Sequence, residues 1–282
     1  MSHIEVIYKA QEVNTVRIVV PIKQVPDMSQ VKFDMEKGKV DRSSAGVEIN
    51  PFDLNALEAA VQIKDKMLVT ITAISMGPPS AESALRDALS RGANDAILLV
   101  DKAFAGADTL ATSYTLAAAI KKLGEFDLII CGEKTVDGDT GQVGPEIAEH
   151  LGIPHIAYVS KIEEIGEKIL ARCEMDGIRY TIECDFPLLI TVTKDINVPR
   201  LPAFSEKLKA RKAEVRIWTA NDLASISDMS KFGATGSSTS VDKVTIPDEE
   251  GRKGEIFRGT GDEAVGRIVD AFRQARILDG KK

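Results

Sequence analysis

The sequence has few of the residue types on which metal centres, disulfides and nucleophilic catalysis depend. It contains three cysteines and three histidines among 282 residues. Cys131, Cys173 and Cys184 form no Cys-x-x-Cys pair, and the histidines show no metal-ligand spacing. We therefore expect reduced thiols, a cytoplasmic location and no metal site. No side chain stands out as a nucleophile or general base, so the sequence assigns no catalytic residue.

Long apolar runs and an excess of positive charge are missing as well. No stretch approaches the length of a transmembrane span, and the N-terminus lacks the apolar core of a signal peptide. The formal net charge is -7, which disfavours attraction to nucleic acid or to an anionic membrane. Hydrophobic residues make up 44% of the chain, so it can bury a real core.

What the sequence does contain is a regular alternation of short apolar runs with segments of helical periodicity. This alternation predicts an α/β fold in which helices flank a parallel sheet. After Ser160, the runs at 162–165, 168–175, 178–184 and 188–193 look like antiparallel strands added to that sheet. Residues 31–34 and 39–41 suggest a small hairpin. The other expected strands are 16–21, 68–76, 95–100, 126–130 and 155–159, and the expected helices are 51–66, 81–91, 109–123, 145–151 and 204–212.

The chain is expected to divide into an α/β domain at residues 16–224 and two flanking segments. Residues 1–15 form an N-terminal extension to which the sequence assigns no role. From residue 225 the composition becomes rich in Ser, Thr and Gly, and an amphipathic helix is expected over 263–278. An arm that ends in such a helix is poorly placed to stabilise its own domain. We therefore expect residues 225–282 to pack on a partner subunit.

The stretch that follows the expected strand 126–130 carries the clearest functional signal. Glycines in such a position let backbone amides approach a ligand, and amides at a helix N-terminus favour phosphate oxygens. Pro21, Met76 and Cys131 also fall at strand ends, where ligands bind in parallel sheets. A nucleotide site is therefore expected around residues 132–144, which we call the glycine-rich segment. Its polar and glycine residues are Gly132, Thr135, Asp137, Gly138, Asp139, Thr140, Gly141, Gln142 and Gly144.

The glycine-rich segment, which runs on into Leu-Gly-Ile-Pro, resembles the β subunit of electron transfer flavoproteins. Three further segments match that family in the expected order: residues 19–27, 49–60 and 197–202. The resemblance covers about residues 16–220. It implies a Rossmann-type fold of the adenine nucleotide α-hydrolase kind and a partner α subunit. It also implies that the cofactor is bound by Pro21, Lys23, Asn50, Met76, Gly77, Cys131, Gly132, Thr135, Asp137, Gly138, Asp139, Thr140, Gly141, Gln142, Val143 and Gly144.

The same resemblance implies a docking segment for a flavin dehydrogenase of the acyl-CoA dehydrogenase or lactate dehydrogenase type. In the family this segment docks through an exposed apolar anchor beside a basic helix. Arg200, Leu201 and Phe204 are the matching residues here, and Phe204 is slightly preferred over Leu201 as the anchor.

The family contains two kinds of β subunit, and the sequence alone leaves both open. Ordinary members hold AMP as a structural group. Bifurcating members hold a second FAD that accepts hydride from NADH; one electron then goes to ferredoxin or flavodoxin, and the other reaches a dehydrogenase through the α-subunit FAD. The ordinary pattern resembles D-D-D-x-N-Q-T-G, whereas Gly138 and Gly141 reduce the charge and bulk near the phosphate. These two glycines and Val143-Gly144-Pro145 favour the FAD-binding kind, although the bifurcating pattern often shows alanine at position 141.

A third interpretation is a nucleotide-binding regulatory protein similar to the universal stress proteins, which share the adenosine-binding architecture. The strands after Ser160 and the C-terminal arm argue against it. A stable partner subunit would separate this class from the two kinds of electron transfer flavoprotein.

Overall fold

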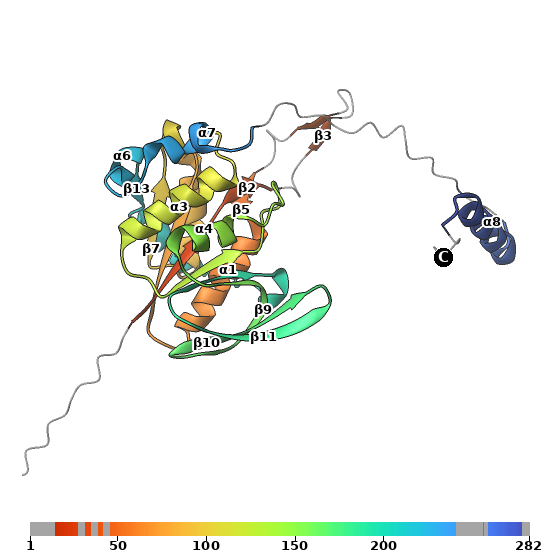
Figure 1. Cartoon of the computed structure of the whole chain (residues 1–282), viewed down its shortest axis with the longest axis horizontal. Coiled ribbons are helices and arrows are strands. Elements are labelled where there is room, and N and C mark those ends of the chain that lie inside the picture. Colours follow the sequence, from red (N-terminus) through yellow and green to blue (C-terminus); the bar gives the residue numbers. More distant parts are fainter. Residues whose placement is uncertain are drawn as a thin grey trace, which may run out of the picture. The chain divides into compact units, whose positions relative to one another are not determined.

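The computed structural model describes residues 15–27, 32–34, 39–41, 46–240, 256 and 259–277. The chain divides into two compact units, Met1–Ser240 and Val241–Lys282. Figure 1 shows the first unit as a sheet with helices on both faces and the second as the helix α8. Residues 1–14 of the expected extension 1–15, and residues 241–255, 257–258 and 278–282 of the expected arm, lie outside the described residues.

A nine-stranded sheet in the order β11-β10-β9-β12-β8-β1-β6-β7-β13 forms the centre of the first unit. From β9 to β13 all neighbouring strands pair in parallel, whereas β9, β10 and β11 form an antiparallel meander. The α/β fold predicted from the sequence is therefore confirmed. The strands are β1 (Val16–Pro21), β6 (Val69–Met76), β7 (Asp95–Leu99), β8 (Leu128–Gly132), β9 (His155–Ile165), β10 (Lys168–Met175), β11 (Ile178–Asp185), β12 (Leu188–Val192) and β13 (Arg216–Trp218).

The expectation that residues 188–193 form an antiparallel strand is wrong. Strand β12 lies between β8 and β9 and is parallel to both. All five of its residues are buried, because helices cover both faces of the sheet at this position. Such unbroken burial is typical of a strand inside a parallel sheet, whereas an added antiparallel strand usually alternates between apolar and polar residues.

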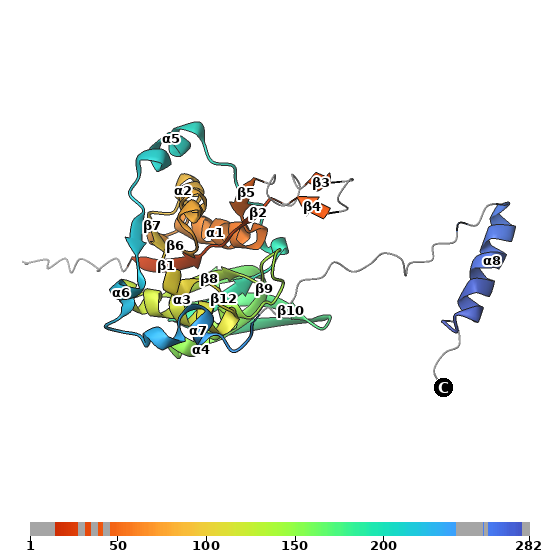
Figure 2. The ribbon, with the colours of Figure 1, turned by 90° about the horizontal axis from the view of Figure 1, so that it is seen from above.

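Two hydrophobic cores, one on each face of the sheet, hold the flanking helices. Alternate residues of β1 point to opposite faces: Ile18 and Val20 join the core beneath α1 and α2, and Val19 joins the core beneath α3 and α4. Figure 2 shows α1 and α2 on one side of the sheet and α3 and α4 on the other. These helices are α1 (Pro51–Lys64), α2 (Glu82–Arg91), α3 (Thr109–Leu123) and α4 (Val143–Leu151).

Short elements complete the first unit. Strands β3 (Lys32–Asp34) and β4 (Lys39–Asp41) pair antiparallel, which confirms the predicted hairpin, and β2 pairs with β5 beside α1. The remaining elements are β2 (Gln24–Pro26), β5 (Val47–Ile49), η2 (Pro79–Ala81), η3 (Lys102–Phe104), η4 (Lys194–Ile196), α5 (Phe204–Lys212), α6 (Ala220–Leu223), η5 (Met229–Lys231) and α7 (Gly233–Gly236).

Residues 225–240, expected as the beginning of an arm, pack within the first unit. Phe232 is buried, and its ring lies edge-on to Phe104 with the centroids 5.2 Å apart. The carboxylate of Asp108 accepts hydrogen bonds from the backbone amides of Ser238 and Thr239. In the second unit, α8 (Gly261–Gln274) begins with a capping box formed by Thr260 and Glu263.

Candidate functional site

The carboxyl ends of three adjacent parallel strands form the base of the candidate site. Strand β1 lies between β6 and β8, so Pro21, Met76 and Gly132 end at one edge of the sheet. The amide of Gly77 extends this edge by donating to the carbonyl oxygen of Leu99 at 3.1 Å. The structure thus brings together the strand ends that the sequence predicted to converge.

Asn50 links this edge to the glycine-rich segment. It occupies the N-cap position of α1, but its side chain makes no capping hydrogen bond to that helix. Instead, its Nδ2 donates to the carbonyl oxygen of Lys134 at 2.9 Å, and its Oδ1 accepts from the amide of Val136 at 3.1 Å. Its own amide donates to the carbonyl oxygen of Lys23 at 2.9 Å. Asn50 is fully buried, so it acts as an internal bracket that shapes the segment.

Asp53 is a buried carboxylate beneath the site that the sequence did not single out. It accepts a hydrogen bond from the amide of Lys23 at 2.8 Å and bonds from Gly132 and Asn50. Burial raises the pKa of Asp53 to about 7, although these hydrogen bonds and the charge of Lys23 oppose the rise. A Cβ atom at Gly132 would lie 2.5 Å from an Asp53 oxygen, so only glycine fits at the end of β8. The sequence signal was the Asn-Pro-Phe-Asp run, which places Asp53 in the first turn of α1.

Two ion pairs cross the outer face of the glycine-rich segment. The Nζ of Lys23 lies 2.8 Å from Asp137 Oδ2, and the Nζ of Lys134 lies 2.8 Å from Asp139 Oδ1. Partial burial would raise the pKa of Asp137, but hydrogen bonds from Lys23 and Thr135 outweigh that effect and leave its pKa below the ordinary value. Asp137 is therefore ionised at neutral pH, and each carboxylate is matched by a lysine.

Glycine is suited to its positions in the segment for different structural reasons. Gly144 is buried, and a Cβ atom there would lie 2.6 Å from Thr191 Cγ2, so it allows α4 to pack closely on β12. Gly141 has a φ of +65°, a conformation that side chains disfavour. A Cβ atom at Gly138 would meet only Thr135 Oγ1, at 3.3 Å. Gly138 therefore leaves the outer backbone uncovered, while Gly144 serves the interior.

The remaining predicted site residues fall into an interior and an outer group. Burial, reinforced by the nearby Asp53, raises the pKa of the Cys131 thiol well above its ordinary value, so this buried cysteine is a packing residue. Thr140 and Gln142 are exposed, and Gln142 Oε1 accepts a hydrogen bond from the hydroxyl of Thr109 at 3.2 Å. Helix α4 begins at Val143, two residues before the expected start. The first amides of a helix have no intrahelical acceptor, and at this end of the segment these are the amides of Val143 and Gly144, because Pro145 has no N–H and the amide of Glu146 donates to the carbonyl oxygen of Gln142.

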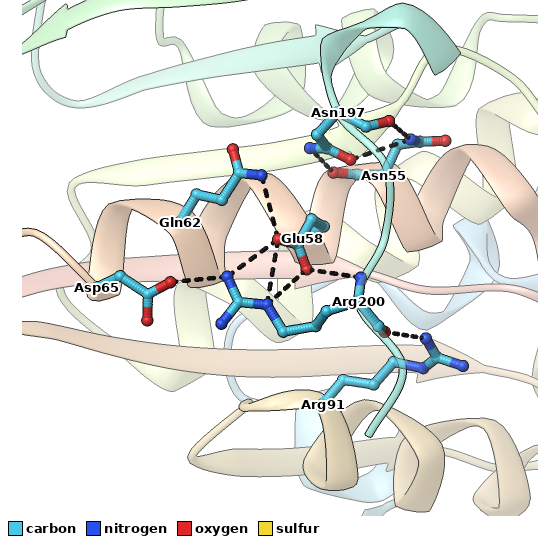
Figure 3. A network of polar contacts seen from close by, with 7 residues as sticks. All are labelled: Asn55, Glu58, Gln62, Asp65, Arg91, Asn197 and Arg200. Carbon is cyan, nitrogen blue, oxygen red and sulfur yellow. Dashed lines mark hydrogen bonds and ion pairs between the residues drawn. The ribbon is translucent and has the colours of Figure 1, made fainter. Parts of the chain in front are cut away.

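The expected docking segment, residues 197–204, runs across helix α1 and exposes apolar side chains. Val198 is 88% exposed, Leu201 87% and Phe204 75%. Figure 3 shows that Arg200 instead turns its guanidinium toward Glu58 of α1 and toward Asp65, the C-cap residue of that helix. Both Leu201 and Phe204 are thus accessible, as an anchor must be, whereas Arg200 is engaged within the chain.

A basic helix follows directly after the exposed residues. Helix α5 begins at Phe204 and carries four exposed cations, which are Lys207, Lys209, Arg211 and Lys212.

In the part of the chain that the structure describes, no helix is long and apolar enough to cross a membrane.

Comparison with known proteins gives consistent matches along almost the whole chain. Residues 37–223 match the family described as electron transfer flavoprotein domain. The electron transfer flavoprotein subunit beta of Clostridium acetobutylicum is 44% identical over 261 residues, which cover 93% of this chain and 99% of the relative. Protein FixA of Azorhizobium caulinodans is 43% identical over 93% of this chain and 96% of its own length. The caffeyl-CoA reductase-Etf complex subunit CarD of Acetobacterium woodii is 39% identical over 93% of this chain and 100% of its own length.

Proposed function

Because this chain belongs to the electron transfer flavoprotein family, as one of its β subunits, we propose that it works in a heterodimer with an α subunit. In this heterodimer the glycine-rich segment holds FAD. FAD bound there would supply the chemistry of hydride acceptance from NADH and of dividing the electrons between ferredoxin or flavodoxin and, through the α-subunit FAD, a partner dehydrogenase. Family membership also favours this class over a regulatory protein of the universal stress kind.

The observation that carries the proposal is the uncovered backbone between Gly138 and the start of α4. Exposed residues border this backbone, and Gly138 and Gly141 place no side chain over it. Backbone amides at the start of a helix favour phosphate oxygens. The residues present therefore fit the pyrophosphate of a dinucleotide, with Pro21, Asn50 and the Met76–Gly77 turn shaping the base of the site.

FAD, when bound, supplies the chemistry, because a flavin exchanges both hydride and single electrons. The chain's own residues orient and enclose the cofactor. Asn50 and Asp53 hold the glycine-rich segment and the end of β1 in place, and Lys23 lies at the rim. Residues 23–27 would line the flavin end of the site, where NADH would approach. No side chain of this subunit is required to move a proton in this scheme.

The second candidate function is an ordinary carrier with AMP in the same site. The site geometry suits the adenosine and phosphate of either nucleotide. Gly138 and Gly141, which replace bulkier and charged residues of the ordinary pattern, favour FAD because they leave room for a second phosphate and its flavin.

The name of the Acetobacterium woodii relative, which places that protein in a complex with a caffeyl-CoA reductase, supports coupling to a dehydrogenase that acts on a CoA ester.

The decisive experiment is to measure the flavin content of the heterodimer and to titrate it with NADH under anaerobic conditions. Two FAD per heterodimer with direct reduction by NADH are expected. One FAD with bound AMP, and no reduction by NADH, would establish the ordinary carrier instead. The double variant Asp137→Ala/Gln142→Ala should lose the FAD of this subunit, because it removes the contacts with Lys23 and Thr109 that hold the segment in shape. Asp176→Ala, in the β10–β11 turn, is a control that should retain it.

We further propose that the 197–204 segment and α5 dock on the partner dehydrogenase. Leu201 or Phe204 enters an apolar pocket, and the exposed cations of α5 face an acidic rim. Leu201→Ala and Phe204→Ala should each raise the KM for the dehydrogenase while leaving reduction of FAD by NADH unchanged. If neither variant changes that KM, the dehydrogenase docks elsewhere.

A further inference from the structure

The 197–204 segment has an exposed outer face and a heavily bonded inner one. It lies between η4 and α5 and belongs to no strand or helix before Phe204. Its side chains Val198, Leu201 and Phe204 point away from a core that would otherwise fix them. What keeps the segment in place must therefore be the polar contacts on its inner side, which Figure 3 shows.

Glu58 is the centre of these contacts. It is only 6% exposed, and its carboxylate receives the Arg200 guanidinium in a two-pronged arrangement, with Nε 2.9 Å from Oε2 and Nη2 3.0 Å from Oε1. The backbone amide of Arg200 also donates to Oε2 at 3.1 Å, and Gln62 Nε2 donates to Oε1 at 3.1 Å. Such a forked, charge-assisted pair fixes geometry as well as distance. Asp65 completes the set by accepting from Arg200 Nη2 at 2.7 Å.

Two further contacts fix the backbone at both ends of the inner face. Asn55 Nδ2 lies 2.9 Å from the carbonyl oxygen of Asn197 and 3.0 Å from its Oδ1, and Asn197 Nδ2 donates to the carbonyl oxygen of Asn55 at 3.0 Å. The carbonyl oxygen of Arg200 accepts from Arg91 Nη1 of α2 at 2.9 Å. The amide, carbonyl and side chain of Arg200 are therefore all engaged within the chain.

Helix α1 provides most of these contacts and also touches the nucleotide site. Asn50, at its N-cap, brackets the glycine-rich segment, and Asn55 and Glu58 follow within the next turns of the same rigid element. At 1.5 Å per residue, Asn50 and Glu58 are separated by about 12 Å along the helix axis. One helix thus sets the position of the exposed apolar side chains relative to the nucleotide site.

We propose that Asn55 and Glu58 are positioning residues that hold the 197–204 segment ready for docking. Arg200 acts on the inside as the partner of Glu58, although the family pattern placed it in contact with the dehydrogenase. Because the segment is already ordered, the conformational entropy lost by Leu201 and Phe204 on docking is smaller. The effect on docking rests on the proposed function, whereas the effect on the segment itself does not.

The first test measures the order of the segment without any dehydrogenase. A nitroxide spin label on Leu201→Cys, in a Cys184→Ser background of the heterodimer, reports local motion. Glu58→Gln should make the label distinctly more mobile. Arg200→Lys should do so as well, because lysine keeps the charge but lacks the planar fork. The matched control is Glu163→Gln, which removes a carboxylate paired with Lys161 and Arg172 on the meander and should leave the spectrum unchanged. Unchanged mobility in both Glu58→Gln and Arg200→Lys would overturn the positioning role.

The second test uses unlabelled heterodimers and either an acyl-CoA dehydrogenase or a flavin lactate dehydrogenase, whichever accepts electrons from the unmodified complex. Arg200→Lys and Glu58→Gln should raise the KM for the dehydrogenase about tenfold, the factor expected when one or two side chains must be ordered on docking. The kcat and the rate of reduction by NADH should stay the same. An unchanged KM alongside a mobile label would overturn the docking role.

The two tests fail separately. If Leu201→Ala and Phe204→Ala leave the KM unchanged, the docking proposal fails, and the label still decides whether Glu58 orders the segment. If those variants raise the KM but Glu58→Gln and Arg200→Lys neither free the label nor change the KM, docking stands and the positioning role is refuted. Thermal unfolding of each variant, at the same heterodimer concentration, shows whether a changed KM reflects a folded complex.

Discussion

Replacing Asn50 by alanine should loosen the glycine-rich segment and weaken cofactor binding together. The substitution removes the hydrogen bonds to the Lys134 carbonyl and the Val136 amide of the segment, leaves both groups without their partner, and also removes a bond to Asp53 within α1. Each lost bond is worth about 1 kcal/mol net, and an unpaired buried group costs somewhat more. The free energy of unfolding should therefore fall by about 2–3 kcal/mol. No capping energy is lost in addition, because the Asn50 side chain does not cap α1.

The consequence for cofactor binding depends on which part of the molecule loses its hydrogen bonds. The bonds to Lys134 and Val136 hold the segment rather than the sheet, so most of the lost energy should appear as disorder of the residues proposed to bind FAD. If the ordered conformation of the segment is destabilised by about 2 kcal/mol, the affinity for FAD should be roughly 30-fold weaker. The assay compares the FAD content of purified heterodimers and the urea-induced unfolding of the full β chain.

Asn94 supplies a matched control at the opposite end of the sheet. Its Oδ1 accepts from the Ile71 amide at 3.0 Å and from Lys64 Nζ at 2.9 Å. Asn94→Ala thus removes two hydrogen bonds of one asparagine, and it should lower stability without loss of FAD. If Asn50→Ala keeps its FAD, or if both variants lose FAD equally, the bracket role of Asn50 is refuted.

Three further predictions concern the interior of the site. Gly144→Ala should destabilise the chain by about 1–3 kcal/mol in urea unfolding through contact with Thr191, whereas Gly266→Ala, in open space on α8, should not destabilise it. Cys131 should resist alkylation in the folded protein and react only in urea, as mass spectrometry of the peptides would show, because burial raises its pKa. Burial raises the pKa of Asp53 to about 7, so folding takes up a proton between about pH 4 and 7. The free energy of unfolding should fall by at most about 4 kcal/mol as pH rises through that window, and Asp53→Asn should lack this component of the slope.

The alternation of strands and helices was predictable because the hydrophobic periods of strands and of helices can both be recognised in short stretches of sequence. Strand β1 and helix α3 have the predicted bounds. The parallel direction of β12 was predictable in principle, because its five residues form an unbroken buried run that is typical of a strand inside a parallel sheet. Residues 225–240 were ambiguous. Their small polar residues are typical of a loop, whereas the contacts that tie them to the first unit, such as Phe232 with Phe104 and Ser238 with Asp108, join residues far apart in the sequence.

The candidate site was predictable as a set of strand ends and glycines, but its internal contacts were not. Position 132 requires glycine because a side chain there would collide with Asp53. This requirement depends on how α1 crosses β8. Likewise, the pairing of Glu58 with Arg200 joins residues 142 positions apart. A charged residue within a helix normally indicates a solvated face, so no local pattern distinguishes a buried partner of this kind.

Under the proposed function, the two ion pairs on the glycine-rich segment indicate how this chain would recognise a phosphate. Because Lys23 and Lys134 are each matched by a carboxylate, these four side chains add no net positive charge to the site. Phosphate binding must then depend mainly on backbone amides and the dipole of α4, and it should depend weakly on salt. A third carboxylate at position 138, as in the ordinary pattern, would leave one negative charge unmatched beside the phosphate. That charge would oppose a diphosphate more than a single phosphate, so Gly138 favours FAD through electrostatics as well as through space.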